Sequence, residues 1–208
     1  MLGSIYAYSG ANTMYRKDAL IDVGLFRQDR ATEDISIAWD HQMDGWLSLF
    51  APRIMFFMEV PESLKMLYRQ RKRWAKGGTE VWLTNFKKVF LHPFDNVGRT
   101  IMFIDQSFSI IWSFFFWISS AIFIWSLFHF AITGNLERIY HMLTMAFLFV
   151  CFEMISGTFQ LVASLIVDDR GRKVKYLLFA PLYMLFYWVM NALTIVTTFV
   201  PAVKTILG

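Results

Sequence analysis

One stretch decides the class of fold: "FIDQSFSIIWSFFFWISSAIFIWSLFHF", residues 103–130. No formal charge lies between Gln106 and Leu136. A helix of about 20 apolar residues crosses a hydrocarbon core of about 30 Å. Residues 140–167, with Glu153 as their sole charge, and the uncharged residues 176–203 form two further stretches of this kind. Three such stretches in a row predict membrane spans rather than the buried helices of a soluble protein.

The composition agrees with a membrane protein. The chain is 56% hydrophobic and 17% charged, whereas soluble domains average roughly 45–50% apolar and about 25% charged residues. Most charges lie in residues 1–100, which predicts a polar half joined to a membrane half. The net charge of +4 suits a cytoplasmic surface beside anionic lipid. It is too small to indicate nucleic acid as a partner.

The loops predict the orientation in the membrane. Residues 168–175, "DDRGRKVK", contain four cations, whereas the loop at 131–138 contains Arg138 against Glu137. Because Lys and Arg are enriched on the cytoplasmic side, we expect residues 168–175 and the basic region 1–100 to be cytoplasmic.

The first half mixes strand and helix patterns. We expect strands at 5–9, 13–16, 47–52 and 53–61, and helices at 17–23, 32–44 and 61–75. Gly77 and Gly78 are expected to end the last of these helices. The domain boundaries follow: 1–79 as part of an α/β domain, 80–100 as an interfacial amphipathic helix and linker, and 101–208 as the transmembrane region. About 80 residues make a poor independent core, so 1–79 reads as the second part of a larger domain.

A cluster of cations, "RQRKRWAKGG" at 69–78, precedes the apolar half. Gln70, Arg73 and Trp74 lie at i, i+3 and i+4, which places them on one helix face. Arginine binds phosphate oxygens in pairs, and tryptophan offers an apolar plane suited to a sugar ring. The alternative is an interfacial helix whose Trp and Arg side chains anchor it at the membrane surface.

Asp34, in "TEDISIAWDHQMDGW" (32–46), is the candidate base. A carboxylate is ionised at neutral pH and takes a proton from a hydroxyl that attacks an electrophile. The alternative is structural, because a carboxylate in the first helical turn stabilises the positive end of the helix dipole.

"TED" (32–34) followed by "QRKRW" (70–74) and by membrane spans resembles the processive, inverting family-two glycosyltransferases. The surrounding residues most resemble the bacterial poly-β-1,6-N-acetylglucosamine synthases. The resemblance implies the C-terminal part of a GT-A-type domain, an interfacial helix and about three transmembrane helices in a bacterial cell membrane. It implies transfer of N-acetylglucosamine from UDP-N-acetylglucosamine to a growing exopolysaccharide, with translocation of the polymer.

The resemblance also implies a role for each motif residue. Asp34 is the catalytic base, and Thr32 and Glu33 position it. Arg73 contacts the donor diphosphate and Gln70 lies beside it, while Trp74, Ser9 and Gly10 face the acceptor sugar. The other cations of the cluster, Arg69, Arg71, Lys72 and Lys76, are expected to face lipid or solvent.

The resemblance further implies a divalent metal, Mg or Mn. Its Asp-x-Asp ligands are expected upstream of this sequence and none within it. The chain alone is therefore expected to be inactive, with the missing N-terminal half of a synthase or an accessory membrane subunit as its partner.

Other functions stay open from the residues alone. A non-catalytic membrane subunit or scaffold for polysaccharide secretion is the first alternative, and a solute transporter is the second. Glu153 is the candidate channel residue, because ionisable groups inside spans usually face the bundle interior or an aqueous path. A buried hydrogen bond between helices would explain Glu153 equally well.

Overall fold

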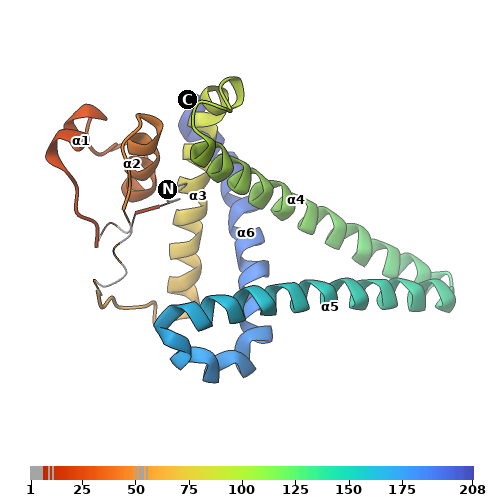
Figure 1. The fold of residues 1–208 in the computed structure, drawn as a ribbon. Helices are drawn as coiled ribbons and strands as arrows, with labels where there is room; N and C mark the ends of the chain where they lie inside the picture. The colour runs from red at the N-terminus through yellow and green to blue at the C-terminus, as the bar shows by residue number, and fades with distance from the viewer. Residues whose placement is uncertain (1–6, 9, 11, 50, 52–53, 55) are drawn as a thin grey trace. The chain divides into compact units, whose positions relative to one another are not determined.

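The computed structural model describes residues 7, 8, 10, 12–49, 51, 54 and 56–208, with the backbone alone for 167–173. The described residues form six α-helices and one 3₁₀-helical segment (Figure 1). In chain order these are α1 Lys17–Asp22, α2 Glu33–Met43, α3 Leu64–Leu91, α4 Val97–Ile132, α5 Leu136–Val167, η1 Asp168–Phe179 and α6 Ala180–Leu207.

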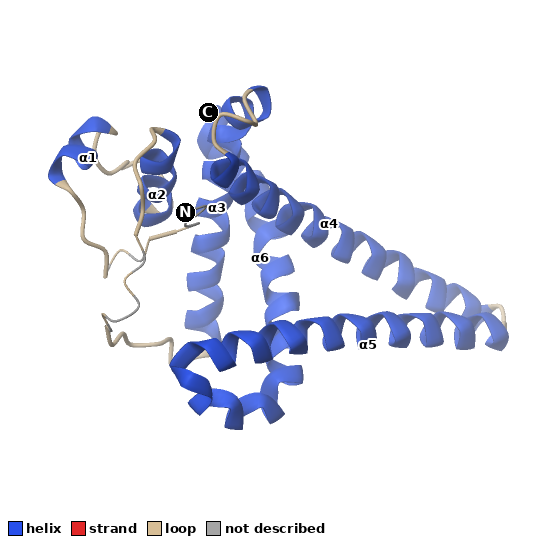
Figure 2. Ribbon diagram, in the orientation of Figure 1, coloured by secondary structure: helices blue, strands red, loops and turns tan. Residues whose placement is uncertain are grey.

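The expected strands are not observed. Among the described residues no strand is present, and the described parts of 5–9, 13–16, 47–52 and 53–61 are turns or loops (Figure 2). A strand exists through hydrogen bonds to a neighbouring strand, and no described segment supplies that neighbour. The helical part of the expected fold is therefore seen, and the α/β part is not.

The two short helices of the first half follow their sequence signals. Gly24 follows α1 with a φ of 82°, and Gly45 follows α2 with a φ of 89°, a backbone conformation that glycine adopts without strain. Thr32 holds the N-cap position of α2, but its side chain makes no capping hydrogen bond.

The expected end of the third helix at Gly77 and Gly78 is wrong. Helix α3 runs unbroken from Leu64 to Leu91 (Figure 1), so it includes the segment expected to form a separate interfacial helix. Ser63 caps its start by accepting a hydrogen bond from the Met66 backbone N–H at 3.3 Å. Both glycines are buried inside the helix. Gly77 serves a close contact with Thr32 rather than a helix stop.

Three helices are long and apolar enough to cross a membrane, as expected: Val97–Ile132, Leu136–Ile166 and Val174–Leu207. Large apolar side chains on them are exposed, including Trp125 at 71% and Phe159 at 73%. Exposed apolar surface of this extent suits lipid rather than water. These helices indicate a multi-pass membrane protein.

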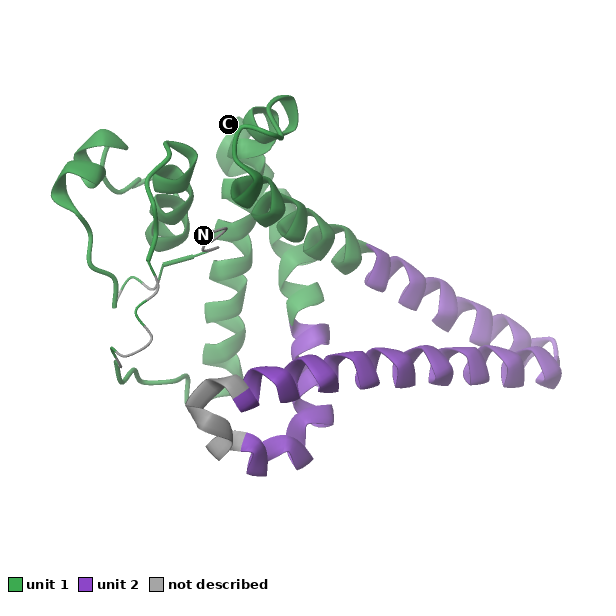
Figure 3. Cartoon of the chain, in the orientation of Figure 1, with its two compact units in different colours: residues 1–114, 191–208 green, residues 115–190 purple. Residues whose placement is uncertain are grey.

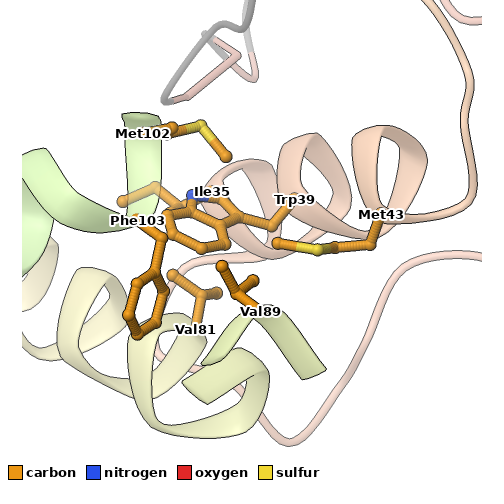
Figure 4. Packing of buried hydrophobic residues seen from close by; sticks show 7 residues of the cluster. All are labelled: Ile35, Trp39, Met43, Val81, Val89, Met102 and Phe103. Atoms are coloured by element: carbon orange, nitrogen blue, oxygen red, sulfur yellow. The ribbon is translucent and has the colours of Figure 1, made fainter. Parts of the chain in front are cut away.

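The chain divides into two compact units (Figure 3). The first contains residues 1–114 and 191–208, and the second contains residues 115–190. The domain boundaries expected near 79 and 100 stay a prediction. In the first unit a hydrophobic core joins α2, α3 and the start of α4 (Figure 4). Its buried members are Ile35, Trp39, Met43, Val81, Val89, Met102 and Phe103.

In the second unit α5 packs against η1 and contacts α6. A Cβ at Gly157 of α5 would lie 2.8 Å from Met184 Sδ and 3.1 Å from Trp188 Cζ2. Glycine at this position therefore lets the two helices approach closely, as small residues do between membrane helices.

Candidate functional site

The Asp34 carboxylate is held by backbone groups on both of its oxygens. Its Oδ1 accepts a hydrogen bond from the Ile35 N–H at 2.9 Å. Its Oδ2 accepts one from the Gly10 N–H at 3.4 Å. These two bonds fix the direction of the carboxylate. The structure thus brings Asp34 and Gly10 together, whereas Ser9 lies outside the described residues.

A cavity of about 440 Å³ opens beside Asp34. Its volume lies in the range of ligand pockets, roughly 300–1,000 Å³. It is lined by Gly10, Tyr15, Phe26, Arg27, Gln28, Arg30, Glu33 and Asp34. The cavity therefore places one further carboxylate, two guanidinium groups and two aromatic rings around the candidate base.

Each arginine of the cavity has a carboxylate partner. Arg27 donates to Asp40 through Nε at 2.7 Å and through Nη2 at 3.2 Å, and this pair raises the pKa of the Arg27 guanidinium. Arg30, with a side chain 10% exposed, lies 2.9 Å from Asp29. These ion pairs hold the two planar cations in place at the cavity wall.

Tyr15 contributes an aromatic ring to the lining of the cavity. Burial raises the pKa of the Tyr15 phenol, and the negative charges of Asp34 and Glu33 raise it further. The phenol therefore stays protonated at neutral pH, and its hydroxyl oxygen is buried. Tyr15 was not among the site residues expected from the sequence. Its position in the loop just before α1 was the only indication in the sequence.

The second motif lies on α3. Gln70 and Trp74 are half-buried, and Arg73 is exposed. The Arg71 guanidinium stacks on the Trp74 ring, with Cζ 4.8 Å from the ring centroid. The expectation that Arg71 faces lipid or solvent is therefore wrong. The stacked cation orients the indole plane and attracts it by a cation–π interaction.

The structure does not bring the second motif into the cavity, because Gln70, Arg73 and Trp74 are not among its lining residues. The helix that carries them, α3, nevertheless contacts the start of α2. A Cβ at Gly77 would overlap Thr32 Oγ1 and lie 2.8 Å from Thr32 Cβ. Gly77 lies four residues beyond Arg73, a rise of about 6 Å along the helix. The turn that carries Asp34 thus packs about one helical turn from Arg73. The catalytic and binding roles of these residues stay predictions.

Glu80 adds a second link between the motifs. Its carboxylate Oε2 accepts a hydrogen bond from the Ala31 N–H at 2.9 Å, and its Oε1 lies 3.2 Å from Lys76 Nζ. Lys76 therefore faces Glu80, contrary to the expectation of lipid or solvent. Glu80 was not among the site residues expected from the sequence. The indication in the sequence was a carboxylate directly after "KGGT" and before the apolar Val81.

Glu153 lies on α5, in the second unit, and is half-buried. The role of Glu153 in a polymer path stays a prediction. The expected divalent metal finds no ligand set here: no three His, Cys, Asp or Glu side chains gather among the described residues.

The comparison with protein families agrees with the two motifs. The model of glycosyl transferase family group 2 matches residues 1–201, and the chain belongs to this family. It is similar to the poly-β-1,6-N-acetyl-D-glucosamine synthase of Staphylococcus epidermidis, with 33% identity over 216 residues, 98% of this chain and 48% of that protein. The synthase of the same name from Staphylococcus aureus strain COL is 36% identical over 112 residues, 54% of this chain and 27% of that protein.

The chain spans about half the length of the Staphylococcus epidermidis relative. No solved structure was found to match it. The relatives therefore show the family of this chain. That the chain takes part in the activity of a whole synthase is a proposal.

Proposed function

We propose that this chain forms the acceptor-side and membrane part of an inverting polysaccharide synthase. It transfers N-acetylglucosamine from UDP-N-acetylglucosamine to a growing β-linked exopolysaccharide and contributes to the path by which the polymer crosses the membrane. One observation carries the proposal: a carboxylate with both oxygens held by backbone N–H groups opens on a cavity of about 440 Å³.

Asp34 acts as the general base in this proposal. The acceptor hydroxyl attacks the anomeric carbon of the donor, its proton moves to the Asp34 carboxylate, and the bond from that carbon to the diphosphate oxygen breaks. A single displacement of this kind inverts the anomeric configuration. A positioned base contributes roughly 10²–10⁴-fold to the rate of such a step.

Arg73 and Trp74 serve the two substrates. Arg73 is exposed and free to reach phosphate oxygens, where its positive charge stabilises the negative charge that develops on the departing diphosphate. Trp74, oriented by Arg71, stacks on the acceptor sugar. Residues 1–100 and 168–175 lie on the cytoplasmic side in this proposal, because their cations follow the positive-inside bias.

The test replaces the matching segment of the Staphylococcus epidermidis synthase by this chain. Membranes with the chimera are supplied with UDP-N-acetylglucosamine and magnesium, and polymer is measured for the parent, for D34N and for the matched control D18N. Asp18 is 73% exposed on α1 and does not line the cavity. We expect D34N to lose at least about 100-fold in rate and D18N to match the parent. Equal polymer from D34N and the parent, or none from the parent, would contradict the proposal and favour a non-catalytic secretion subunit.

A further inference from the structure

Glu80 is a carboxylate buried in the middle of a helix. Its side chain is 0% exposed, although burial of a charge is costly unless hydrogen bonds and an ion partner compensate. Lys76, one turn earlier on α3, supplies the ion partner at 3.2 Å. The other carboxylate oxygen goes to another part of the chain, the backbone N–H of Ala31 at 2.9 Å.

Ala31 precedes the helix start that carries Asp34. A capping residue normally holds such a start by accepting a hydrogen bond from the first turn. Thr32 makes no such bond, and its Oγ1 has no hydrogen-bond partner among the described residues. Instead, two contacts from α3 hold this part of the backbone. The Glu80 carboxylate accepts a hydrogen bond from the Ala31 N–H, and Gly77 packs closely against Thr32.

The position of Asp34 depends on this attachment. The Ser36 N–H bonds to the Thr32 carbonyl at 3.3 Å, which begins α2 and sets where its first turn lies. Asp34 lies within that turn, so a shift of Ala31 and Thr32 moves its carboxylate relative to the cavity and to α3. Glu80 does not line the cavity, and its effect on Asp34 passes through the backbone.

We propose that Glu80 is a positioning residue of the transfer reaction, which holds the Ala31 N–H and thereby sets the Asp34 carboxylate relative to the substrates bound by α3. This inference rests on the proposed function of Asp34. It predicts that loss of the hydrogen-bond acceptor lowers kcat while the binding of the donor is kept, because Arg73 lies on α3 and stays in place.

The experiment compares three substitutions of Glu80 in the same chimera. E80Q keeps an oxygen that accepts from Ala31, E80M has a similar length without an acceptor, and E80D keeps the charge but is one methylene shorter. Misplacement by about 1 Å costs on the order of 100-fold in rate. We therefore expect kcat to fall about 10- to 100-fold in E80M and E80D, with the donor KM within about twofold of the parent. E80Q should recover most of the parent kcat.

E62M is the matched control, because Glu62 is exposed just before α3, and it should behave as the parent. If E80M does not reach the membrane, E80D and E80Q still decide the question. A parent-like kcat in E80D, or a kcat in E80Q as low as in E80D, overturns the inference. D34N is measured alongside these variants. If D34N keeps its activity, the proposed function is wrong. If D34N is inactive and E80D has the kcat of the parent, only the proposed role of Glu80 is wrong.

Discussion

Gly77 of α3 packs directly on Thr32, the residue before α2, with no room for a side chain between them. A Cβ at position 77 would lie 2.8 Å from Thr32 Cβ and 2.9 Å from Thr32 Cγ2. Both residues are buried, Thr32 at 0% exposure. The contact joins the acidic motif at the start of α2 to the helix that carries Gln70, Arg73 and Trp74.

Substitution of Gly77 by larger residues should therefore destabilise the first unit. Gly to Ala in a helix interior is favourable by roughly 0.5–1 kcal/mol from helix propensity alone. Overpacking against a buried neighbour costs about 1–3 kcal/mol, so we expect a net loss in G77A and a larger loss in G77V. Thermal unfolding in detergent micelles measures both. K87A, on the exposed side of α3, should stay within about 0.5 kcal/mol of the parent. A more stable G77A would show that helix propensity dominates and that the contact is loose.

Arg73 and its neighbour Lys72 offer a test of how the donor diphosphate is bound. Both side chains are exposed, but guanidinium binds two phosphate oxygens at once and ammonium does not. A charge-assisted hydrogen bond contributes about 1.5–3 kcal/mol, so R73K should lower kcat/KM for the donor roughly 10- to 100-fold in the chimera. K72R preserves the charge and should leave kcat/KM within about twofold of the parent. Similar effects of the two substitutions would remove the specific role of Arg73 and favour a general electrostatic attraction.

His41 makes the stability of the first unit depend on pH. It is 4% exposed on α2, with the rings of Tyr8 and Tyr15 each 6.0 Å away. Burial lowers the pKa of His41 below 6.5. A backbone hydrogen bond with Ala19 and the charges of Asp40 and Asp44 act in the opposite direction but are outweighed. The unfolded chain therefore binds the proton at a higher pH than the folded chain.

The sign of the effect follows from this difference. The contribution of His41 is fully present above about pH 6.5 and is lost as the pH falls from there through the lowered pKa of the folded state. Melting temperatures between about pH 7.5 and about pH 5.5 should fall more steeply for the parent than for H41Q, which has no group titrating in this range. The two curves falling in parallel would show that other groups, and not His41, cause the dependence.

The helices were predictable from the sequence because their signals are local. Apolar runs define α4, α5 and α6, and glycines with positive φ follow α1 and α2. The expected strands rested on local alternation, which does not show whether another strand lies beside them. Two glycines in a row gave the same local signal as a helix end, but Gly77 meets a residue 45 positions earlier in the sequence, which no local pattern contains.

The candidate site was predictable to a similar extent. Its two motifs, around Asp34 and Arg73, were visible as short stretches of sequence. The hydrogen bond between Gly10 and Asp34 agrees with the expectation that these two residues belong to one site. The partners that hold the motifs in place were not visible. Charged residues in a basic cluster are usually solvated, and this expectation hid the contact of Arg71 with Trp74, three residues further along α3. The contact of Glu80 with Ala31 joins residues 49 positions apart, which no local pattern contains.

Glu153 tests whether the membrane helices take part in moving the polymer. It is the sole charged residue of its apolar stretch and is half-buried on α5. If its carboxylate lines an aqueous path for sugar hydroxyls, E153Q should lower the yield of polymer outside the cell several-fold, roughly the effect of losing about 1 kcal/mol in hydrogen bonding. Total synthesis in opened membranes should then change less than secretion. Thr144→Ala is the control, because Thr144 bonds to the Tyr140 carbonyl of its own helix. A secreted yield in E153Q equal to that of the parent would indicate that Glu153 serves the packing of helices and not the passage of sugar.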